Sequence, residues 1–284
     1  MILVTGASGQ LGKLIVSSLL ARGVAADNIV AAVRSPEKAS DLSDLGVVVR
    51  KADYTDAASL NTAMEGVKRV MLVSSSEVGQ RAVQHQNVID AAKAANVELL
   101  AYTSILHADT SPLALAEEHK QTEAALKASG VPHVLLRNGW YSENYTMGAG
   151  MAVEHGAVLG SAGEGKYSTA TRADYADAAA TVVTSEDQAG KVYELAGDEA
   201  FTLAEYAAYI AKISGKEVVY QDLPEAEYTK VLVSVGLPEG FAAILADSDV
   251  GASKGGLFDD SHTLSKLIGR PTTPIQDTLK LALL

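Results

Sequence analysis

Short runs of hydrophobic residues alternate with segments of helical period along the first half of the chain. After the fourth run, Val88, Ile89, Ala92 and Ala95 recur at helical spacing. The alternation predicts an α/β fold, a Rossmann-type doubly wound parallel sheet with right-handed crossovers. The predicted strands are Met1–Thr5, Ile29–Val33, Val47–Val49, Val70–Val73, Leu99–Ser104 and Val134–Arg137.

The pattern loosens beyond about residue 150. We therefore expect an NADP-binding Rossmann domain over residues 1–150 and a smaller α/β lobe on the substrate side over residues 151–284, with some later segments returning to the Rossmann sheet. Val192–Leu195 is a further predicted strand, and Thr202–Glu205 has the spacing of a capping box. The glycines of Gly251–Gly256 predict a flexible loop that would allow the smaller lobe to close.

A glycine-rich turn follows the first predicted strand and leads into a helix. Gly6, Gly9 and Gly12 have the spacing G-x-x-G-x-x-G, which points to the short-chain dehydrogenases. In such a turn the glycines permit a tight bend, backbone approach to a pyrophosphate and close packing of the helix. The N-terminus of the helix adds free N–H groups for the anion. The alternative is a turn with a structural role only.

Two charged residues after later strands bear on the nucleotide. Arg34 ends the second predicted strand, where the adenosine ribose lies in a dinucleotide fold, and an arginine there accommodates a 2′-phosphate. It favours NADPH over NADH, unless it is simply a solvated surface residue. Asp53 follows the third strand and could either accept from the adenine amino group or cap the helix that starts near Ala57.

The segment Asn138–Tyr145 carries the chain's only tryptophan and two tyrosines among amide and hydroxyl groups. Aromatic side chains with polar ends suit a planar ring ligand. The same residues could instead form a packed corner between lobes. Both interpretations remain open from the residues alone.

Composition excludes several classes of function. The net charge of −12 argues against nucleic acid as a partner, because phosphate backbones require a basic surface. The absence of cysteine removes disulfides and thiolate chemistry. No apolar run reaches membrane-spanning length and no signal peptide precedes the first strand, so we expect a soluble cytoplasmic protein without a membrane partner. The six histidines are scattered, and no metal site is expected.

The usual acid of a short-chain dehydrogenase is missing. Most active members carry Tyr-x-x-x-Lys on the helix after the fifth strand, but His119 and Glu123 stand at that spacing here. His119 could titrate near neutral pH and donate a proton, or it could form a structural helix pair with Glu123. Asn138 and Tyr141 are the other candidates for catalysis. A site without a strong acid suits a quinone better than a ketone, because the hydroquinone monoanion is stabilised by its ring.

Several motifs together resemble one family. They are Thr5–Gly12, Val33–Pro36, Ser74–Arg81, Leu136–Tyr145 and Ala246–Asp260. The chain is similar over essentially its whole length to the NmrA-like, atypical short-chain dehydrogenases, and within them to the type-2 NADPH:quinone oxidoreductases of bacteria. Ser8 stands where the family often has threonine, which retains a hydroxyl.

The resemblance implies a set of cofactor-binding residues. The pyrophosphate would lie on the first turn, the 2′-phosphate on Arg34, and the nicotinamide between the loop after the fourth strand and the Asn138–Glu143 loop. Arg172 would reach towards the cofactor from the second lobe. The implied residues are Gly6, Ala7, Ser8, Gly9, Gln10, Leu11, Arg34, Ser76, Glu77, Val78, Asn138, Gly139, Trp140, Tyr141, Ser142, Glu143 and Arg172.

The leading hypothesis is an NADPH-dependent quinone oxidoreductase that transfers a hydride directly to a small quinone, without flavin or metal. The alternative is an NmrA-like redox sensor that binds the dinucleotide and a regulatory partner without turnover. An enzyme acting on sugar nucleotides comes last, because that chemistry requires the acid–base pair that is missing. Whether the protein forms a homo-oligomer is left open.

Overall fold

The structure is a computed structural model that describes residues 1–283. The chain divides into two compact units, each assembled from separate segments. Residues 139–150 belong to unit 2, and residues 172–193 return to unit 1 after the end of the expected first domain. Unit 1 comprises Met1–Ile105, Glu118–Asn138 and Arg172–Tyr193, and unit 2 comprises Leu106–Glu117, Gly139–Thr171 and the chain from Glu194 onward.

Unit 1 is built on the main sheet, whose strand order is β3-β2-β1-β4-β5-β6-β9. Ile2 of β1 pairs in parallel with Ile29 of β2 on one side and with Arg69 of β4 on the other. The order reverses between β1 and β4, so the sheet has the topological switch point of a doubly wound fold. The predicted fold class is confirmed. The strands are β1 Ile2–Thr5, β2 Ile29–Val33, β3 Val48–Lys51, β4 Arg69–Leu72, β5 Leu99–Ile105, β6 His133–Asn138 and β9 Val192–Leu195.

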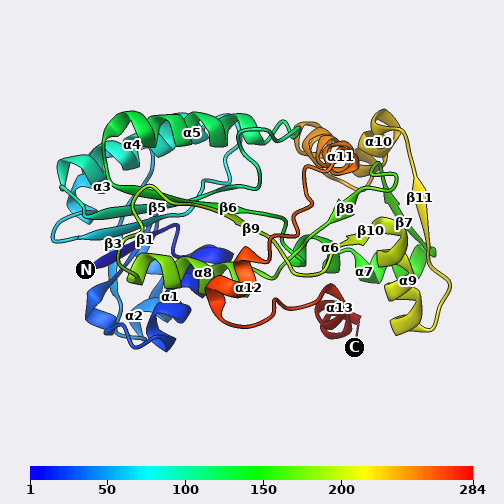
Figure 1. Cartoon of the computed structure of the whole chain (residues 1–284), viewed down its shortest axis with the longest axis horizontal. Helices are drawn as coiled ribbons and strands as arrows, with labels where there is room; N and C mark the ends of the chain where they lie inside the picture. Colours follow the sequence, from blue (N-terminus) through cyan, green and yellow to red (C-terminus); the bar gives the residue numbers. More distant parts are fainter. Residues whose placement is uncertain (284) are drawn as a thin grey trace. The chain divides into compact units, whose positions relative to one another are not determined.

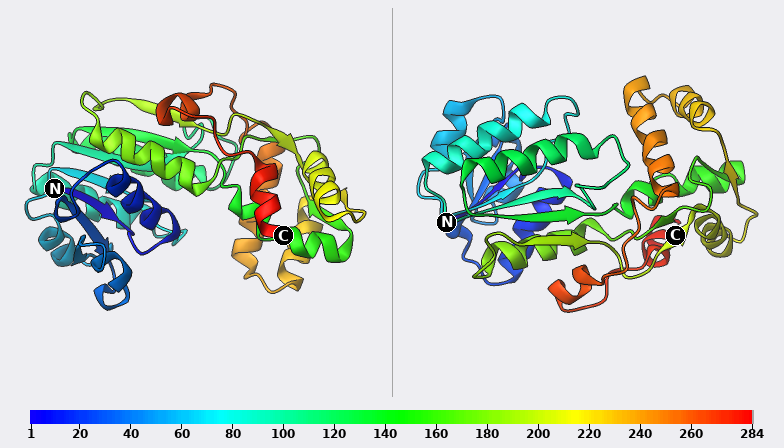
Figure 2. Two further views of the ribbon diagram at one scale, coloured as in Figure 1. Left: turned by 90° about the horizontal axis from the view of Figure 1, so that it is seen from below. Right: turned by 45° about the horizontal axis from the view of Figure 1, so that its top comes forward.

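Helices cover both faces of this sheet (Figures 1 and 2). One face carries α1 and α8, and the other carries α3, α4 and α5. Ser18 of α1 donates to Asp177 of α8 at 2.7 Å, which joins two segments that lie far apart in the sequence. The helices are α1 Gln10–Ala21, α2 Ser40–Ser43, α3 Ala57–Ala63, α4 Arg81–Ala94, α5 Ala116–Ser129 and α8 Arg172–Thr184, with short 3₁₀ turns at Ala26–Asn28 and Pro36–Lys38.

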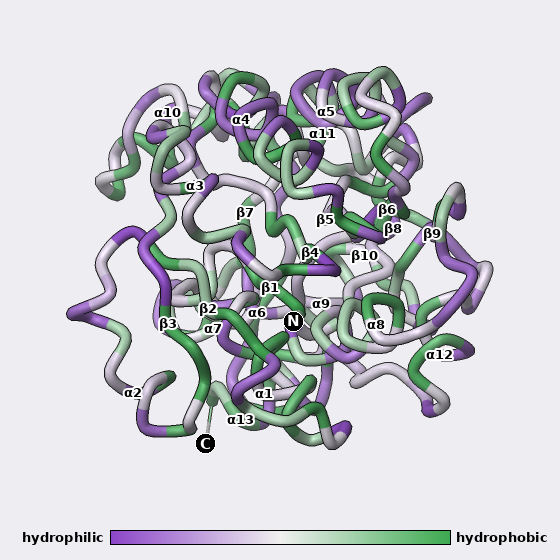
Figure 3. Tube along the Cα trace, turned by 90° about the vertical axis from the view of Figure 1, so that its left-hand side faces the viewer, coloured by the Kyte–Doolittle hydropathy of each residue, from purple (hydrophilic) through white to green (hydrophobic). Residues whose placement is uncertain are grey.

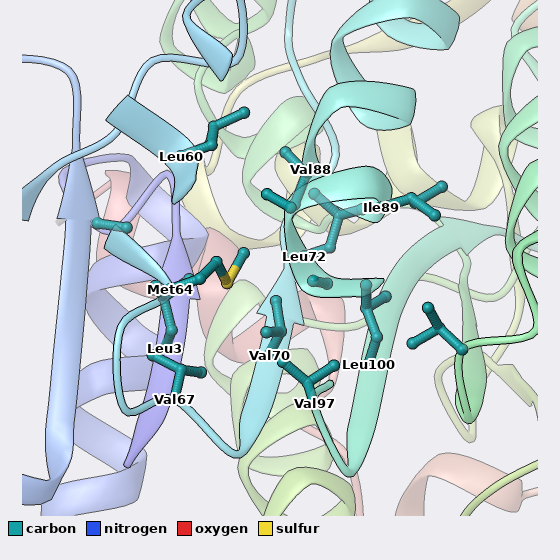
Figure 4. Close-up of a cluster of buried hydrophobic side chains, with 14 of the residues drawn as sticks. Leu3, Leu60, Met64, Val67, Val70, Leu72, Val88, Ile89, Val97 and Leu100 are labelled. Carbon is teal, nitrogen blue, oxygen red and sulfur yellow. The ribbon is translucent and has the colours of Figure 1, made fainter. Parts of the chain in front are cut away.

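The core of unit 1 lies between the sheet and the helices α3 and α4. Leu3, Val70 and Leu100 come from three adjacent strands and are fully buried against Val88 and Ile89 of α4 (Figure 4). Each such side chain stabilises the fold by about 1.5–3 kcal/mol when it is fully buried. The trace is correspondingly hydrophobic along much of β1 and β2 (Figure 3). A strand that is apolar at every position is typical of a sheet covered on both faces.

Unit 2 combines short strands with several helices. The predicted capping box is confirmed at the start of α9, where Thr202 accepts from the Glu205 backbone and Glu205 accepts in return. In the described part of the chain, no helix is long and apolar enough to cross a membrane. The elements are α6 Glu143–Thr146, α7 Ala149–His155, β7 Ala157–Gly160, β8 Lys166–Tyr167, β10 Phe201–Thr202, α9 Leu203–Ser214, β11 Val219–Asp222, α10 Glu225–Ser234, α11 Glu239–Ser253, α12 Thr263–Ile268 and α13 Ile275–Leu283.

The prediction of a flexible loop at Gly251–Gly256 is wrong. Residues 251–253 are the last turn of α11, and Gly251 is buried. A Cβ at Gly251 or at Gly256 would press against the side chain of Leu113 at 2.8 or 2.6 Å. Gly251 and Gly256 therefore provide space for close packing within unit 2.

Candidate dinucleotide site and aromatic pocket

The turn between β1 and α1 has the geometry of an anion cradle. Gly6 adopts a φ of +57°, a conformation that side-chain-bearing residues rarely take, and its carbonyl accepts from the Gly9 N–H at 2.9 Å. A Cβ at Gly12 would overlap the backbone of Gly6 and Ala7, so glycine lets the helix approach the turn. Gly9 precedes α1 and has no side chain to cap it, so the first N–H groups remain available to an anion.

Tyr54, which the motif analysis did not single out, forms hydrogen bonds beneath the glycine turn, at the ends of β1 and β4. The Tyr54 hydroxyl lies 2.5 Å from Thr5 Oγ1 and 2.7 Å from the Val73 carbonyl. Thr5 Oγ1 also accepts from the Val73 N–H at 3.0 Å. These bonds connect the carboxyl ends of β1 and β4 at the switch point. Burial raises the pKa of the Tyr54 phenol above its usual range, so the hydroxyl stays protonated and can donate.

Arg34 directly follows β2, as the sequence predicted for a residue that binds the 2′-phosphate. Its guanidinium is 70% exposed and forms an ion pair with Glu77 at 2.9 Å. Glu77 also accepts from Gln84 Nε2 at 2.8 Å. Arg34 is thus a solvent-accessible cation directly after β2.

Asp53 does not cap the next helix. Its carboxylate accepts from the backbone N–H and the hydroxyl of Thr55 at 2.9 and 2.8 Å. These bonds lower the pKa of Asp53, the backbone bond contributing most. The cap of α3 is Asp56, which accepts from Ala58 and Ser59. One sequence alternative for Asp53 is therefore wrong, because its carboxylate is used in a local turn three residues before the helix cap.

The loop after β4 is held by side chains of α4 and α5. The Glu118 carboxylate accepts from the backbone N–H groups of Gly79 and Arg81, each at 3.0 Å. Arg81 Nε donates to the Ser75 carbonyl at 2.6 Å, and the Ser75 N–H donates to His85 at 2.9 Å. This network fixes both ends of the loop that carries the predicted residues 76–78.

His119 is a buried member of the same network. Its Nδ1 lies 2.7 Å from the Tyr102 hydroxyl and its Nε2 3.4 Å from Arg81. Burial, with the nearby Arg81 charge, lowers the pKa of His119 to about 3, so the ring is neutral at pH 7. The expected pair with Glu123 does not form, since Glu123 binds Ser104 and Arg137 at 2.6 and 2.7 Å. The expectation of a histidine that titrates near neutral pH is wrong, because burial removes the ring from solvent.

Asn138, the last residue of β6, carries an unused acceptor. The residue is 5% exposed, and its Oδ1 has no hydrogen-bond partner among residues 1–283. Buried acceptors without partners are rare and mark sites where a ligand or water is expected. The Asn138 Oδ1 atom is therefore available to accept a hydrogen bond from a ligand at the end of β6.

The Gly139–Glu143 segment is hydrogen-bonded to other segments of unit 2. The Gly139 N–H donates to Leu195 and the Ser142 N–H to Ala170, while the Ser142 hydroxyl contacts Thr169 at 3.0 Å. Ser142 is fully buried, whereas Trp140 and Tyr141 are only partly covered. The two aromatic side chains can thus reach a ligand, while Ser142 acts within the fold.

Most of the remaining predicted residues lie at the carboxyl ends of strands in the main sheet. The turn after β1, Arg34 after β2, residues 76–78 after β4 and Asn138 on β6 stand at the carboxyl ends of parallel strands. These ends meet at one edge of the sheet, where doubly wound folds bind ligands. Arg172 is the first residue of α8 and belongs to unit 1, so the expectation that it reaches the cofactor from the second lobe is wrong about its unit. Glu143 is the first residue of α6 in unit 2.

Unit 2 contains an aromatic pocket with a volume of about 590 Å³. Tyr145 lines this pocket, and its ring lies 5.2 Å from Tyr167 and 5.7 Å from Tyr206. Trp140 and Tyr228 also line the pocket, together with mainly aliphatic side chains. Such a cavity is large enough for a planar ring system of drug-like size. Sequence analysis found Trp140 and Tyr145 but had no signal for Tyr206 and Tyr228, which come from distant helices.

One acidic residue lies in the pocket lining. Asp249 is 7% exposed and accepts from the Tyr167 hydroxyl at 2.7 Å and from the Ser161 N–H at 3.0 Å. Burial raises the pKa of its carboxyl group. No group of three or more histidine, aspartate or glutamate residues that could hold a metal ion occurs within residues 1–283.

The chain matches a family of known proteins. The profile of a family described as NAD(P)H-binding matches residues 6–186, which include the glycine turn, Arg34 and Asn138. Quinone oxidoreductase 2 of Escherichia coli K12 is 60% identical over 279 residues, covering 98% of this chain and 97% of that protein.

Solved structures agree with this match. The NADPH complex of the NADPH-dependent quinone oxidoreductase of Escherichia coli superimposes with a TM-score of 0.97 at 59% identity, covering 99% of both chains. The triphenylmethane reductase of Citrobacter sp. in complex with NADP(H) superimposes with a TM-score of 0.95 at 40% identity, covering 100% of both chains. The family resemblance inferred from the sequence motifs is confirmed.

Proposed function

The chain belongs to the NAD(P)H-binding family, and from this we propose that it is an NADPH-dependent quinone oxidoreductase that transfers a hydride to its substrate without flavin. The observation that carries the substrate assignment is the 60% identity to a quinone oxidoreductase along 98% of the chain. This identity also favours an enzyme over a sensor without turnover.

The residues of unit 1 fit the dinucleotide. We assign the pyrophosphate to the Gly6–Leu11 turn, whose backbone N–H groups are free at the start of α1. Arg34 is assigned to the 2′-phosphate, which a guanidinium can bind with two parallel hydrogen bonds. The orphan acceptor of Asn138 suits a carboxamide N–H of the nicotinamide. We assign residues 76–78, on the loop that Glu118 and Arg81 hold, to the nicotinamide side of the site.

The chemistry follows from what the residues can and cannot supply. NADPH, when bound, supplies the hydride. His119 is neutral rather than an imidazolium at neutral pH, so it is a poor general acid at the position where related enzymes carry their tyrosine. A quinone tolerates this, because the charge of the hydroquinone monoanion is spread over its ring and water can protonate it. The protein contributes binding and orientation, which can account for about 7–11 kcal/mol of a barrier.

The aromatic pocket of unit 2 is the part of the chain that we assign to the quinone. Its aromatic lining offers ring faces to a planar substrate, and its volume of about 590 Å³ admits two fused rings. Tyr141 and Trp140, which precede it in the chain, are assigned to the same ligand region.

The test is the loss of NADPH absorbance when purified protein meets a panel of simple quinones. We expect rapid oxidation with quinones, slower oxidation when NADH replaces NADPH, and none with a plain ketone. Oxidation with the ketone at a comparable rate would contradict the acid-free mechanism. Tight NADPH binding without oxidation by any quinone would favour the dinucleotide sensor.

A further inference from the structure

The aromatic pocket of unit 2 contains a single carboxylate. Asp249 is the only acidic residue of its described lining, and that lining holds no lysine or arginine. The surrounding side chains are mainly aliphatic and aromatic, and His155 is the one other side chain of the described lining that could carry a charge near neutral pH.

The negative charge of Asp249 has only neutral partners. Each carboxylate oxygen accepts one bond, from the Tyr167 hydroxyl and from the Ser161 N–H. No ion pair with Asp249 occurs among residues 1–283. A carboxylate can accept about four hydrogen bonds, so two acceptor positions remain unused. The nearby carboxylate of Asp222 adds to the negative potential.

A buried carboxyl group without a counter-charge is costly to ionise, and a cation that enters the pocket would favour its ionised form. The pocket also presents the rings of Tyr145, Tyr206 and Tyr228, whose faces attract cations. Carboxylate and ring faces therefore favour the same kind of ligand. That ligand is an aromatic system with a positive charge, because it would restore charge balance at Asp249 and stack on the tyrosines.

We propose that the pocket selects quinones that carry a positively charged substituent, and that Asp249 is the specificity-determining residue. The turnover part of this inference rests on the proposed function, whereas the binding part does not. The quinone accepts a hydride with both electrons, NADPH becomes NADP⁺, and the hydroquinone monoanion takes its second proton from water. The charged substituent is unchanged by the reaction and serves recognition alone.

The experiment uses three naphthoquinones with the same ring system, which carry a trimethylammonium group, no charge or a sulfonate group. Trp140 is the only tryptophan of the chain and lines the pocket, so quenching of its fluorescence reports binding directly. The same compounds are then compared as substrates by kcat/KM with saturating NADPH.

For the unaltered protein we expect the cationic quinone to bind roughly tenfold more tightly than the neutral one, and the sulfonate to bind most weakly. In Asp249→Asn the three affinities should converge to within about threefold, and kcat/KM should follow. The amide can keep both local bonds, accepting from Ser161 and donating to the Tyr167 oxygen, so the fold is retained. Tyr167→Phe keeps the carboxylate and should keep the preference for the cation.

The matched control is Asp260→Asn, which removes the same charge from an exposed position outside the pocket. It corrects for the attraction that a net charge of −12 exerts on any cation, and it should leave the order of the quinones intact. Equal binding of the three quinones to the unaltered protein, or an unchanged order in Asp249→Asn, would overturn the proposal. Charge-ordered binding without turnover would instead refute the proposed function and leave the selectivity standing.

Discussion

Arg34 is the side chain to which we assign the choice between NADPH and NADH. Its ion pair with Glu77 is exposed on both sides, and such pairs contribute only about 0–1 kcal/mol in water. A doubly charged phosphate that binds the guanidinium through two hydrogen bonds is a stronger partner. The ion pair with Glu77 is therefore weak enough for Arg34 to exchange it for the proposed bond to the 2′-phosphate.

We expect Arg34→Ala to raise the KM for NADPH roughly tenfold or more, because a hydrogen bond to a charged group contributes about 1.5–3 kcal/mol. NADH lacks the 2′-phosphate, so its KM should change by less than about threefold. Steady-state kinetics with both cofactors measure the difference. An unchanged preference for NADPH would show that another residue binds the phosphate.

His119 makes folding sensitive to acid. Its pKa is about 3 in the folded protein against an ordinary value of 6.5, so the unfolded chain takes up a proton that the folded protein refuses. The stabilisation is fully present above pH 6.5 and is lost as the pH falls towards 3. Each such histidine lowers the free energy of unfolding by about 1.4 kcal/mol per pH unit within this window.

We expect His119→Gln to flatten the fall in stability below pH 6.5, because glutamine can bond to Tyr102 but does not titrate. Urea unfolding between pH 7 and pH 4 measures this slope. His155→Gln, at an exposed position, is the control and should keep the slope of the unaltered protein. Equal slopes in both variants would contradict the buried, neutral state of His119.

At the scale of elements, α1 depends on its contact with the glycine turn. We expect Gly12→Ala to lower Tm and to weaken NADPH binding at least tenfold, because the new methyl group would push α1 away from the backbone of Gly6 and Ala7. Calorimetry and NADPH titration measure the two effects. Gly240→Ala in α11 is the matched control, since its methyl group meets nothing within 4 Å. It should be neutral or stabilising by up to about 1 kcal/mol.

Local patterns were sufficient to predict many elements. The strands Ile29–Val33 and Val192–Leu195 and the capping box at Thr202 have the predicted bounds, because hydrophobic runs and cap spacing involve only neighbouring residues. Arg34 likewise stands directly after its strand. Glycine content misled at Gly251, because it cannot distinguish a flexible backbone from a helix that must pack closely on Leu113.

The site itself depends on partners that are distant in sequence. Thr5 and Val73 are 68 residues apart, and Glu118 lies 39 residues from Gly79. No periodicity connects such pairs, so the support under the turn and the clamp on the loop could not be predicted. The low pKa of His119 was hidden for the same reason, because its burial depends on Tyr102 and Arg81 from other elements.

At the scale of the whole molecule, the chain leaves unit 1 and returns to it. The segment Arg172–Tyr193 supplies α8, which lies beside α1, and the first part of the edge strand β9. Unit 1 is thus incomplete until residues far beyond the glycine turn are present. We therefore expect that a cut at residue 150 would not separate an autonomous dinucleotide-binding domain.

This has a consequence for biosynthesis. Synthesis proceeds at about 5–20 residues per second, so the cradle made from the earliest residues must wait roughly 10–40 seconds for α8 to leave the ribosome. We expect a chain ending at residue 150 to be insoluble on expression, because the face of α1 that meets α8 would stay exposed. A soluble, NADPH-binding fragment would contradict this. In the full chain, we expect cofactor affinity to appear only after α8 has left the ribosome. The growing polypeptide and the finished protein therefore expose different surfaces to cellular chaperones.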